Sequence, residues 1–242
     1  MKAWMVWVAL LVLTMPVALP PSHGQAPVSR PAHPRGARPS PRWKAFVTPQ
    51  HRARLDIPAS FGVVIPQLSC WGNCTYGDCV SAEECFAKAS YALTQGAPEL
   101  FIPENTIVAW ASSHGFLNGA NLTDVMDAMA ADGISVNGVM YKDGPYQSVN
   151  FADYATLCSA IYAGPVKLGI AAGQLESVVN STNDQSGWWA VGLSSDQNED
   201  HSIPALGYGT AAQLAALLNV QVPSGLAPTT PCIKQEIGRA HV

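Results

Sequence analysis

The stretch YGDCVSAEECF, residues 76–86, places a cysteine directly after a glycine-containing turn and at the start of a helical pattern. Asp78 suits the N-cap of a helix that runs from Cys79 to about Leu93. The apolar positions of this helix fall on one stripe, at Ala82, Phe86, Ala89 and Leu93. A thiol in the first helical turn lies beside unpaired backbone N–H groups and the positive end of the helix dipole, which favours the thiolate. The pattern makes Cys79 a candidate nucleophile.

A candidate base stands 122 residues after this cysteine, at His201 in EDHSIPALGYG, residues 199–209. The run from Ser202 to Tyr208 reads as a strand. An imidazole within reach of a thiol can take its proton and later protonate a leaving amine. Cysteine and histidine are each often structural when taken alone, so the pair carries more weight than either residue.

The chain divides into segments of different composition. Residues 1–26 are mostly apolar after a positive start at Lys2 and fit a secretory signal peptide, with a retained anchor as the alternative. Residues 27–54 are rich in proline and arginine, lack apolar periodicity and predict an extended linker. Residues 55–236 remain for one globular domain, which is long enough for one large core or two smaller lobes.

Charge and cysteine content restrict the function further. The net charge of −4 gives no support for nucleic-acid binding. An exported chain can oxidise its thiols, so some of the six cysteines are expected to pair, although the sequence does not define the pairs. Cys70 and Cys74 resemble half of a zinc site, but no second half follows at short spacing. We therefore expect neither a metal nor another cofactor.

The order of the predicted elements indicates an α+β fold. Helices are predicted first and strands later, as in domains where the two kinds of structure are segregated. The predicted helices cover residues 79–93, 103–114, 122–131, 152–163 and 211–218, and the predicted strands cover 165–171, 187–193 and 202–208.

Three segments in this order resemble the papain-like cysteine peptidase superfamily, in a divergent, bacterial-type form. YGDCVSAEECF resembles the nucleophile and central helix of the family, AGPVKLGI (residues 163–170) resembles the strand that begins its β lobe, and EDHSIPALGYG resembles its histidine strand. The resemblance covers residues 55–209 and implies two lobes. A helical N-terminal lobe would carry the central cysteine helix, and the C-terminal lobe would be antiparallel β.

The resemblance also implies roles for individual residues. Cys79 would be the nucleophile and His201 its general base. Asn73 stands six residues before Cys79, where the family has its oxyanion-hole glutamine, and it would stabilise an oxyanion together with a backbone N–H. The expected partner is a peptide or protein substrate, with no membrane insertion after signal cleavage, and the oligomeric state stays open.

Several residues depart from the family pattern. Val80 replaces the usual tryptophan, and Tyr76 replaces a usual cysteine. Asp78 and Glu83 bring negative charge close to Cys79, which would raise the pKa of the thiol and oppose its activation. The Asn-Ser-Trp motif that supplies the asparagine orienting the histidine is missing, and Asn219 is the candidate substitute. No long helical propeptide precedes residue 55, so an autoinhibited zymogen of the usual kind is not expected.

The last six residues, IGRAHV at 237–242, can be back-translated into a common sequencing adapter followed by a stop. They predict a non-native tail on a gene that continues, with the orienting residue and the last strands lost. Recovery of the gene from an independent assembly tests this expectation.

The sequence thus predicts an exported papain-like thiol hydrolase that cleaves peptide or related amide bonds through Cys79 and His201. Two alternatives stay open. The fold can serve as an inactive secreted binding or surface-interaction module, or the same residue pair can serve an acyl transferase or cell-wall amidase, since hydrolysis and transfer share a thioester.

Overall fold

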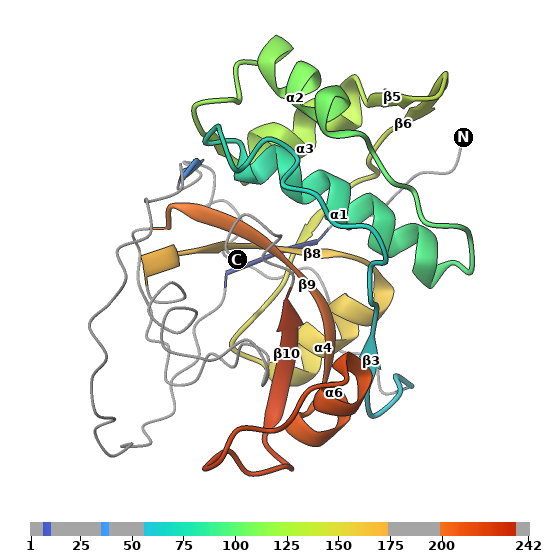
Figure 1. Ribbon diagram of the computed structural model, residues 1–242, viewed down its shortest axis with the longest axis vertical. Helices are drawn as coiled ribbons and strands as arrows, with labels where there is room; N and C mark the ends of the chain where they lie inside the picture. The colour runs from blue at the N-terminus through green and yellow to red at the C-terminus, as the bar shows by residue number, and fades with distance from the viewer. Residues whose placement is uncertain (1–6, 11–34, 39–55, 174–198, 236–242) are drawn as a thin grey trace.

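The computed structural model describes residues 7–10, 35–38, 56–173 and 199–235 (Figure 1). The expected strand at 187–193, the tail at 237–242 and most of the expected signal and linker segments lie outside these residues. The described chain is α+β, as predicted, with three helices gathered at one end of the molecule and a sheet with two further helices at the other.

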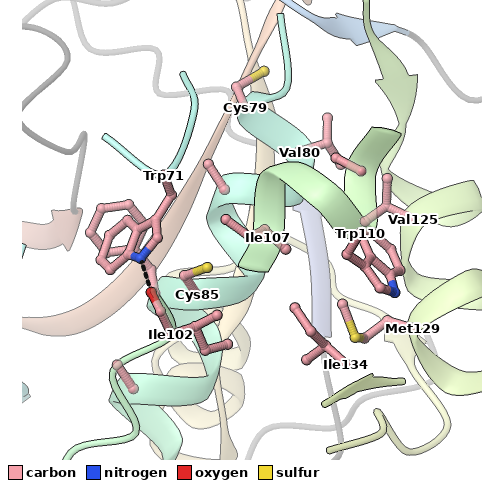
Figure 2. Packing of buried hydrophobic residues seen from close by; sticks show 14 of the residues in the cluster. Trp71, Cys79, Val80, Cys85, Ile102, Ile107, Trp110, Val125, Met129 and Ile134 are labelled. Carbon is pink, nitrogen blue, oxygen red and sulfur yellow. Dashed lines mark hydrogen bonds between the residues drawn. The ribbon is translucent and has the colours of Figure 1, made fainter. Parts of the chain in front are cut away.

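The helical lobe is built from α1 (Cys79–Thr94), α2 (Glu104–Ser113) and α3 (Leu122–Ala131), with a hairpin of β5 (Ile134–Val136) and β6 (Val139–Tyr141). Their apolar side chains form one buried cluster (Figure 2). Trp71 is fully buried in this cluster, where its indole N–H donates to the Ile102 carbonyl at 2.7 Å and its ring meets Phe86 edge to face. These contacts fix the loop before α1 against the helix.

The sheet forms the second lobe. Its strands lie in the order β10 (Pro231–Gln235), β9 (His201–Thr210), β8 (Val166–Ile170), β1 (Trp7–Leu10) and β7 (Gln147–Ser148). β3 (Phe61–Gly62) also pairs with β9. β9 is antiparallel to β3, β8 and β10, as predicted, whereas β1 is parallel to β7 and β8. The sheet is therefore mixed.

Two more helices belong to the sheet lobe, α4 (Tyr154–Ala163) and α6 (Ala211–Leu218). α4 begins two residues later than predicted, because Asp153 caps it and accepts from the Ala155 N–H at 3.1 Å. α4, β8 and β9 share a second buried apolar cluster, separate from that of the helical lobe. The two clusters correspond to the two lobes.

α1 lies between the lobes and contacts both β9 and β8. Every residue of α1 from Cys79 to Ser90 is buried, including the polar residues Glu83, Glu84 and Lys88. The predicted single apolar stripe is therefore too narrow, since a helix packed between two layers has no solvent face. Glu83 and Glu84 of α1 face β8, where both carboxyl groups lie near the ammonium group of Lys167.

The N-terminal segments take part in pairing. β1 lies within the stretch predicted to be a signal peptide, and β2 (Ala37–Arg38) lies within the predicted linker. In the described part of the chain, no helix combines the length and apolar character needed to cross a membrane.

We expect mass spectrometry of the exported protein to show a new N-terminus after Ala18 or Ala26, because residues 1–26 are predicted to be a signal peptide. A mature chain that retains β1 would contradict this prediction.

Candidate active site

Cys79 is the first residue of α1 (Figure 2), and its side chain is only 1% exposed. Burial raises the pKa of its thiol to about 12, although hydrogen bonds with the backbone of Gly36 and Ser202 lower it. The charges of Glu83 and Asp78 raise it further, as expected from the sequence. The predicted activation by the helix N-terminus is therefore outweighed in this state, because desolvation penalises the thiolate more than these backbone groups stabilise it.

A disulfide between Cys70 and Cys74 closes the loop before α1. Cys79, Cys85, Cys158 and Cys232 are free thiols, so the candidate nucleophile is not consumed by a disulfide. Within the described residues, no three acidic, histidine or cysteine side chains lie together as a metal site would require. The disulfide accounts for the Cys70 and Cys74 pattern without zinc.

Asn73 lies in the disulfide-closed loop and is buried. Its neighbour Gly72 has a φ of +94° and packs against the Asp78 carboxyl group, where an added Cβ would lie 3.1 Å from Cγ. The loop is thereby fixed beside the start of α1. The Oδ1 atom of Asn73 is buried with no hydrogen-bond donor among the described groups. These contacts place Asn73 in the loop that precedes α1, and its role in an oxyanion hole stays a prediction.

Asp78 occupies the N-cap position of α1, but its side chain makes no capping hydrogen bond. Burial raises the pKa of this carboxyl group to about 7, while a hydrogen bond with its own backbone lowers it and the charge of Glu104 raises it. The predicted position of Asp78 as the N-cap residue is confirmed, but its side chain does not cap the helix. The carboxyl group packs on Gly72 instead of turning toward the free N–H groups of the helix.

His201 is the first residue of β9 and is 2% exposed. The backbone of its neighbour, Ser202, hydrogen-bonds to the Cys79 sulfur. The strand that carries the histidine therefore meets the first turn of α1 one residue from His201. The structure brings together the two chain segments that sequence reasoning selected as nucleophile and base.

A short N-terminal stretch, which we call segment 35–38, lies against the thiol, because the backbone of Gly36 hydrogen-bonds to the Cys79 sulfur. The Ala37 N–H donates to the Asp200 carbonyl at 3.1 Å, and the Ala120 N–H donates to the Gly36 carbonyl at 2.8 Å. β2 runs parallel to β4 (Ala120–Asn121), so the segment is bound to the helical lobe on one side and to the start of β9 on the other. An extended peptide thus lies across the thiol.

Charged groups and close packing fix the same segment. The Arg35 guanidinium lies 2.5 Å from a carboxylate oxygen of Asp200, and Arg38 donates to the Asn118 carbonyl at 2.6 Å. Gly36 passes so close to the Gly77 carbonyl that an added Cβ would collide with it. Only glycine fits at this point without moving the backbone.

Asn219 does not lie near His201. It ends α6 in a left-handed conformation, with φ at +54°. The side chain of Leu217, two residues earlier, packs over Gly62, which pairs with Gly207. Gly207 is six strand residues from His201, about 20 Å along β9. Asn219 therefore serves the helix end, and this geometry gives no support for its proposed orienting role.

Sequence reasoning did not select two features of the site. The sequence did not predict that segment 35–38 packs on the domain, because a proline- and arginine-rich stretch has no apolar periodicity that indicates packing. The second feature is a set of buried charges on α1 and β8. Lys167 within the apolar stretch AGPVKLGI was a usable signal, since a lysine in a buried strand requires an acidic partner.

Comparison with known proteins gives a limited result. No protein-family model and no curated protein matches the chain. A crystal structure of the Amb a 11 cysteine protease of ragweed pollen in its proform aligns with a TM-score of 0.41 and 15% identity, over 65% of this chain and 53% of that one. The likeness is low in both fold overlap and sequence.

Two digestive proenzymes from the larval midgut of Tenebrio molitor give similar values. Procathepsin L 3 aligns with a TM-score of 0.37 and 18% identity, over 70% of this chain and 63% of that one. Procathepsin L2 aligns with a TM-score of 0.33 and 17% identity, over 73% and 61%. This chain thus spans 53% to 63% of the lengths of the three structures. At these values the likeness does not assign the chain to a family.

Proposed function

We propose that the chain is an exported, papain-like thiol hydrolase that cleaves peptide or related amide bonds, with Cys79 as nucleophile and His201 as general base. The observation that carries the proposal is the extended segment 35–38, which is bound by main-chain hydrogen bonds on both sides and whose Gly36 backbone hydrogen-bonds to the Cys79 sulfur. Main-chain bonding of this kind recognises a peptide backbone whatever its side chains. The position beside the thiol is therefore suited to a peptide.

In the proposed reaction, a substrate first replaces segment 35–38. His201 takes the thiol proton while the Cys79 sulfur attacks the amide carbonyl, and the oxyanion accepts hydrogen bonds from the Cys79 N–H and the Asn73 side chain. His201 then gives the proton to the amine as the C–N bond breaks, leaving a thioester. Water attacks the thioester, releasing the acid and restoring the thiol.

The raised pKa of the Cys79 thiol favours one alternative function, an inactive secreted binding module. A buried thiol with a pKa of about 12, beside the carboxyl groups of Glu83 and Asp78, is a poor nucleophile as it stands. An inactive secreted binding module would have this property permanently. In a hydrolase, displacement of segment 35–38 must hydrate the thiol and lower its pKa. The acyl-transfer alternative uses the same thioester and differs only in the acceptor.

A substrate screen tests the proposal. The full chain, its Gly36→Leu variant and the same proteins with Cys79→Ala are incubated with quenched fluorescent peptide libraries. We expect hydrolysis, faster with Gly36→Leu, a return to background with Cys79→Ala and a large loss with His201→Ala. Hydrolysis that survives Cys79→Ala, or no turnover of any peptide by the Gly36→Leu variant, would contradict the proposal. Added amine acceptors, with products identified by mass, separate transfer from hydrolysis.

A further inference from the structure

Five charged side chains are buried together between α1, β8 and the loop after β6. Each is at most 7% exposed, and they comprise two ammonium groups and three carboxyl groups: Lys88, Lys167, Glu83, Glu84 and Asp143. Full ionisation would leave one uncompensated negative charge inside the protein. Since burying an unpaired charge is costly, one of the carboxyl groups is expected to hold a proton near neutral pH.

The contacts show which carboxyl groups are best paired. Glu84 bonds to Lys167 and lies 3.2 Å from the Lys88 ammonium group. Lys88 also lies 2.5 Å from Asp143. Glu83 is paired less closely, because its nearest ammonium group, that of Lys167, is 4.0 Å away. Glu83 is thus a candidate for the protonated carboxyl group.

The pKa shifts agree with these contacts. Burial raises the pKa of Glu83 to about 8, although Lys167 and Ser202 lower it. Burial likewise raises the pKa of Asp143 to about 7. For Glu84, burial is outweighed by Lys167 and Lys88, which hold the pKa below its usual value. The neutral form of Glu83 therefore gives way to the charged form near pH 8.

Ser202 connects Glu83 to the candidate active site. Its hydroxyl donates to the Glu83 carboxyl group, and its backbone hydrogen-bonds to the Cys79 sulfur. Glu83 follows Cys79 by four residues, which puts both side chains on the same face of α1. His201 precedes Ser202 on β9. One serine therefore links the buried carboxyl group to the thiol, beside the candidate base.

We propose that Glu83 is a positioning residue that holds the His201–Ser202 end of β9 against Cys79, and that loss of the Glu83 proton suppresses the reactivity of the thiol. The role as positioning residue rests on the proposed function, whereas the charge coupling stands on the geometry. Among the described residues, Lys167 from β8 and Glu84 from α1 are the titratable groups that act most strongly on Glu83, and Glu83 acts in turn on Cys79. Lys88 and Asp143 act on it through these partners.

The sign of the effect follows from the charges. Below pH 8 Glu83 is mostly neutral, so only desolvation and the remaining groups oppose the thiolate. Above pH 8 ionised Glu83 adds a like charge one helical turn from the sulfur, which disfavours the thiolate further. A glutamine keeps an oxygen to accept from Ser202 and never ionises. The wild-type and Glu83→Gln proteins should therefore differ in thiol reactivity only at high pH.

Alkylation kinetics of the full chain test the proposal. Iodoacetamide labelling of Cys79, followed by peptide mass mapping from pH 6 to pH 9.5, gives the rate ratio of Glu83→Gln to wild type. We expect a ratio near one at pH 6 that rises to about tenfold at pH 9.5. A matched variant, Glu99→Gln, removes a carboxylate that bonds Gln67 away from the buried set and should give a ratio of one throughout.

A ratio that does not change with pH would overturn the proposal, because it would show that Glu83 acts only through packing. If Glu83→Gln does not fold, the wild-type profile decides: the slope of log rate against pH should fall near pH 8, and a constant slope overturns the proposal. The positioning role is tested in the peptidase assay by Ser202→Ala, which should lower kcat with little change in KM. Iodoacetamide labelling measures the coupling between Glu83 and Cys79 even if no peptide is cleaved. Failure of the proposed peptidase function is therefore distinguishable from failure of the proposed charge coupling.

Discussion

Replacement of Gly36 by leucine is expected to raise the alkylation rate of Cys79 by about 100-fold. The leucine Cβ would collide with the Gly77 carbonyl and push segment 35–38 off the thiol. This displacement would break the hydrogen bonds to Asp200 and Ala120 and the Arg35 ion pair. At about 1 kcal/mol each, these three interactions correspond to about 100-fold in the opening equilibrium. Iodoacetamide labelling with peptide mass mapping measures the change.

Gly173→Leu is the matched control for this variant, because an added Cβ at Gly173 meets no atom of the described residues within 4 Å. Its Cys79 should react at the wild-type rate. An unchanged rate in Gly36→Leu would show that segment 35–38 does not limit access to the thiol. The peptide library then separates access from catalysis, since a displaced segment exposes the thiol whether or not it can cleave a substrate.

Replacement of Lys167 by methionine is expected to lower the free energy of unfolding by about 3–5 kcal/mol at pH 7. Lys167 is fully buried, bonds to Glu84 and lies 4.0 Å from Glu83. Removal of its charge leaves these carboxyl groups without their nearest cation. Urea denaturation followed by circular dichroism measures the loss.

Two further variants define the cause. Lys142→Met removes an exposed lysine that bonds the Ala131 carbonyl, and it should change stability by less than about 0.5 kcal/mol. The double variant Lys167→Met, Glu84→Leu removes both members of the buried pair. It should regain part of the lost stability, because the ionised carboxyl group of Glu84 is no longer buried without the lysine that it binds. A single variant as stable as wild type would show that the network does not stabilise the fold.

The sequence predicted the elements that carry strong local signals. α1 follows a glycine turn and repeats apolar residues at helical spacing, so its start at Cys79 was predicted correctly. β9 was recognised from its apolar run and its glycines, and the structure brings its first residues to the start of α1. The meeting of Cys79 with the His201 strand could be expected only through the family resemblance, because local patterns do not specify which distant elements pack together.

Other parts of the site depend on tertiary contacts and could not be predicted. Glu83 and Glu84 have the spacing of ordinary surface residues on a helix, and only their contacts with Lys167 and Ser202 show that they are buried. Gly36 and Ala37 are bound by main-chain groups of Ala120 and Asp200, which lie far along the chain. Asn219 was selected by its distance in sequence, which does not reveal that a ten-residue strand carries it away from His201.

The charged layer between α1 and the sheet has a mechanical consequence. Two apolar surfaces can slide past one another at modest cost, because dispersion contacts have no fixed partners. Lys167 of β8 instead binds Glu84 of α1, and Ser202 of β9 donates to Glu83 of α1, so a shift of a few ångströms between the helix and the sheet would leave these charged and polar groups unpaired at once. These specific contacts therefore fix the position of the helical lobe relative to the sheet lobe. Access to Cys79 should accordingly come from peeling away a four-residue segment and not from a hinge between the lobes.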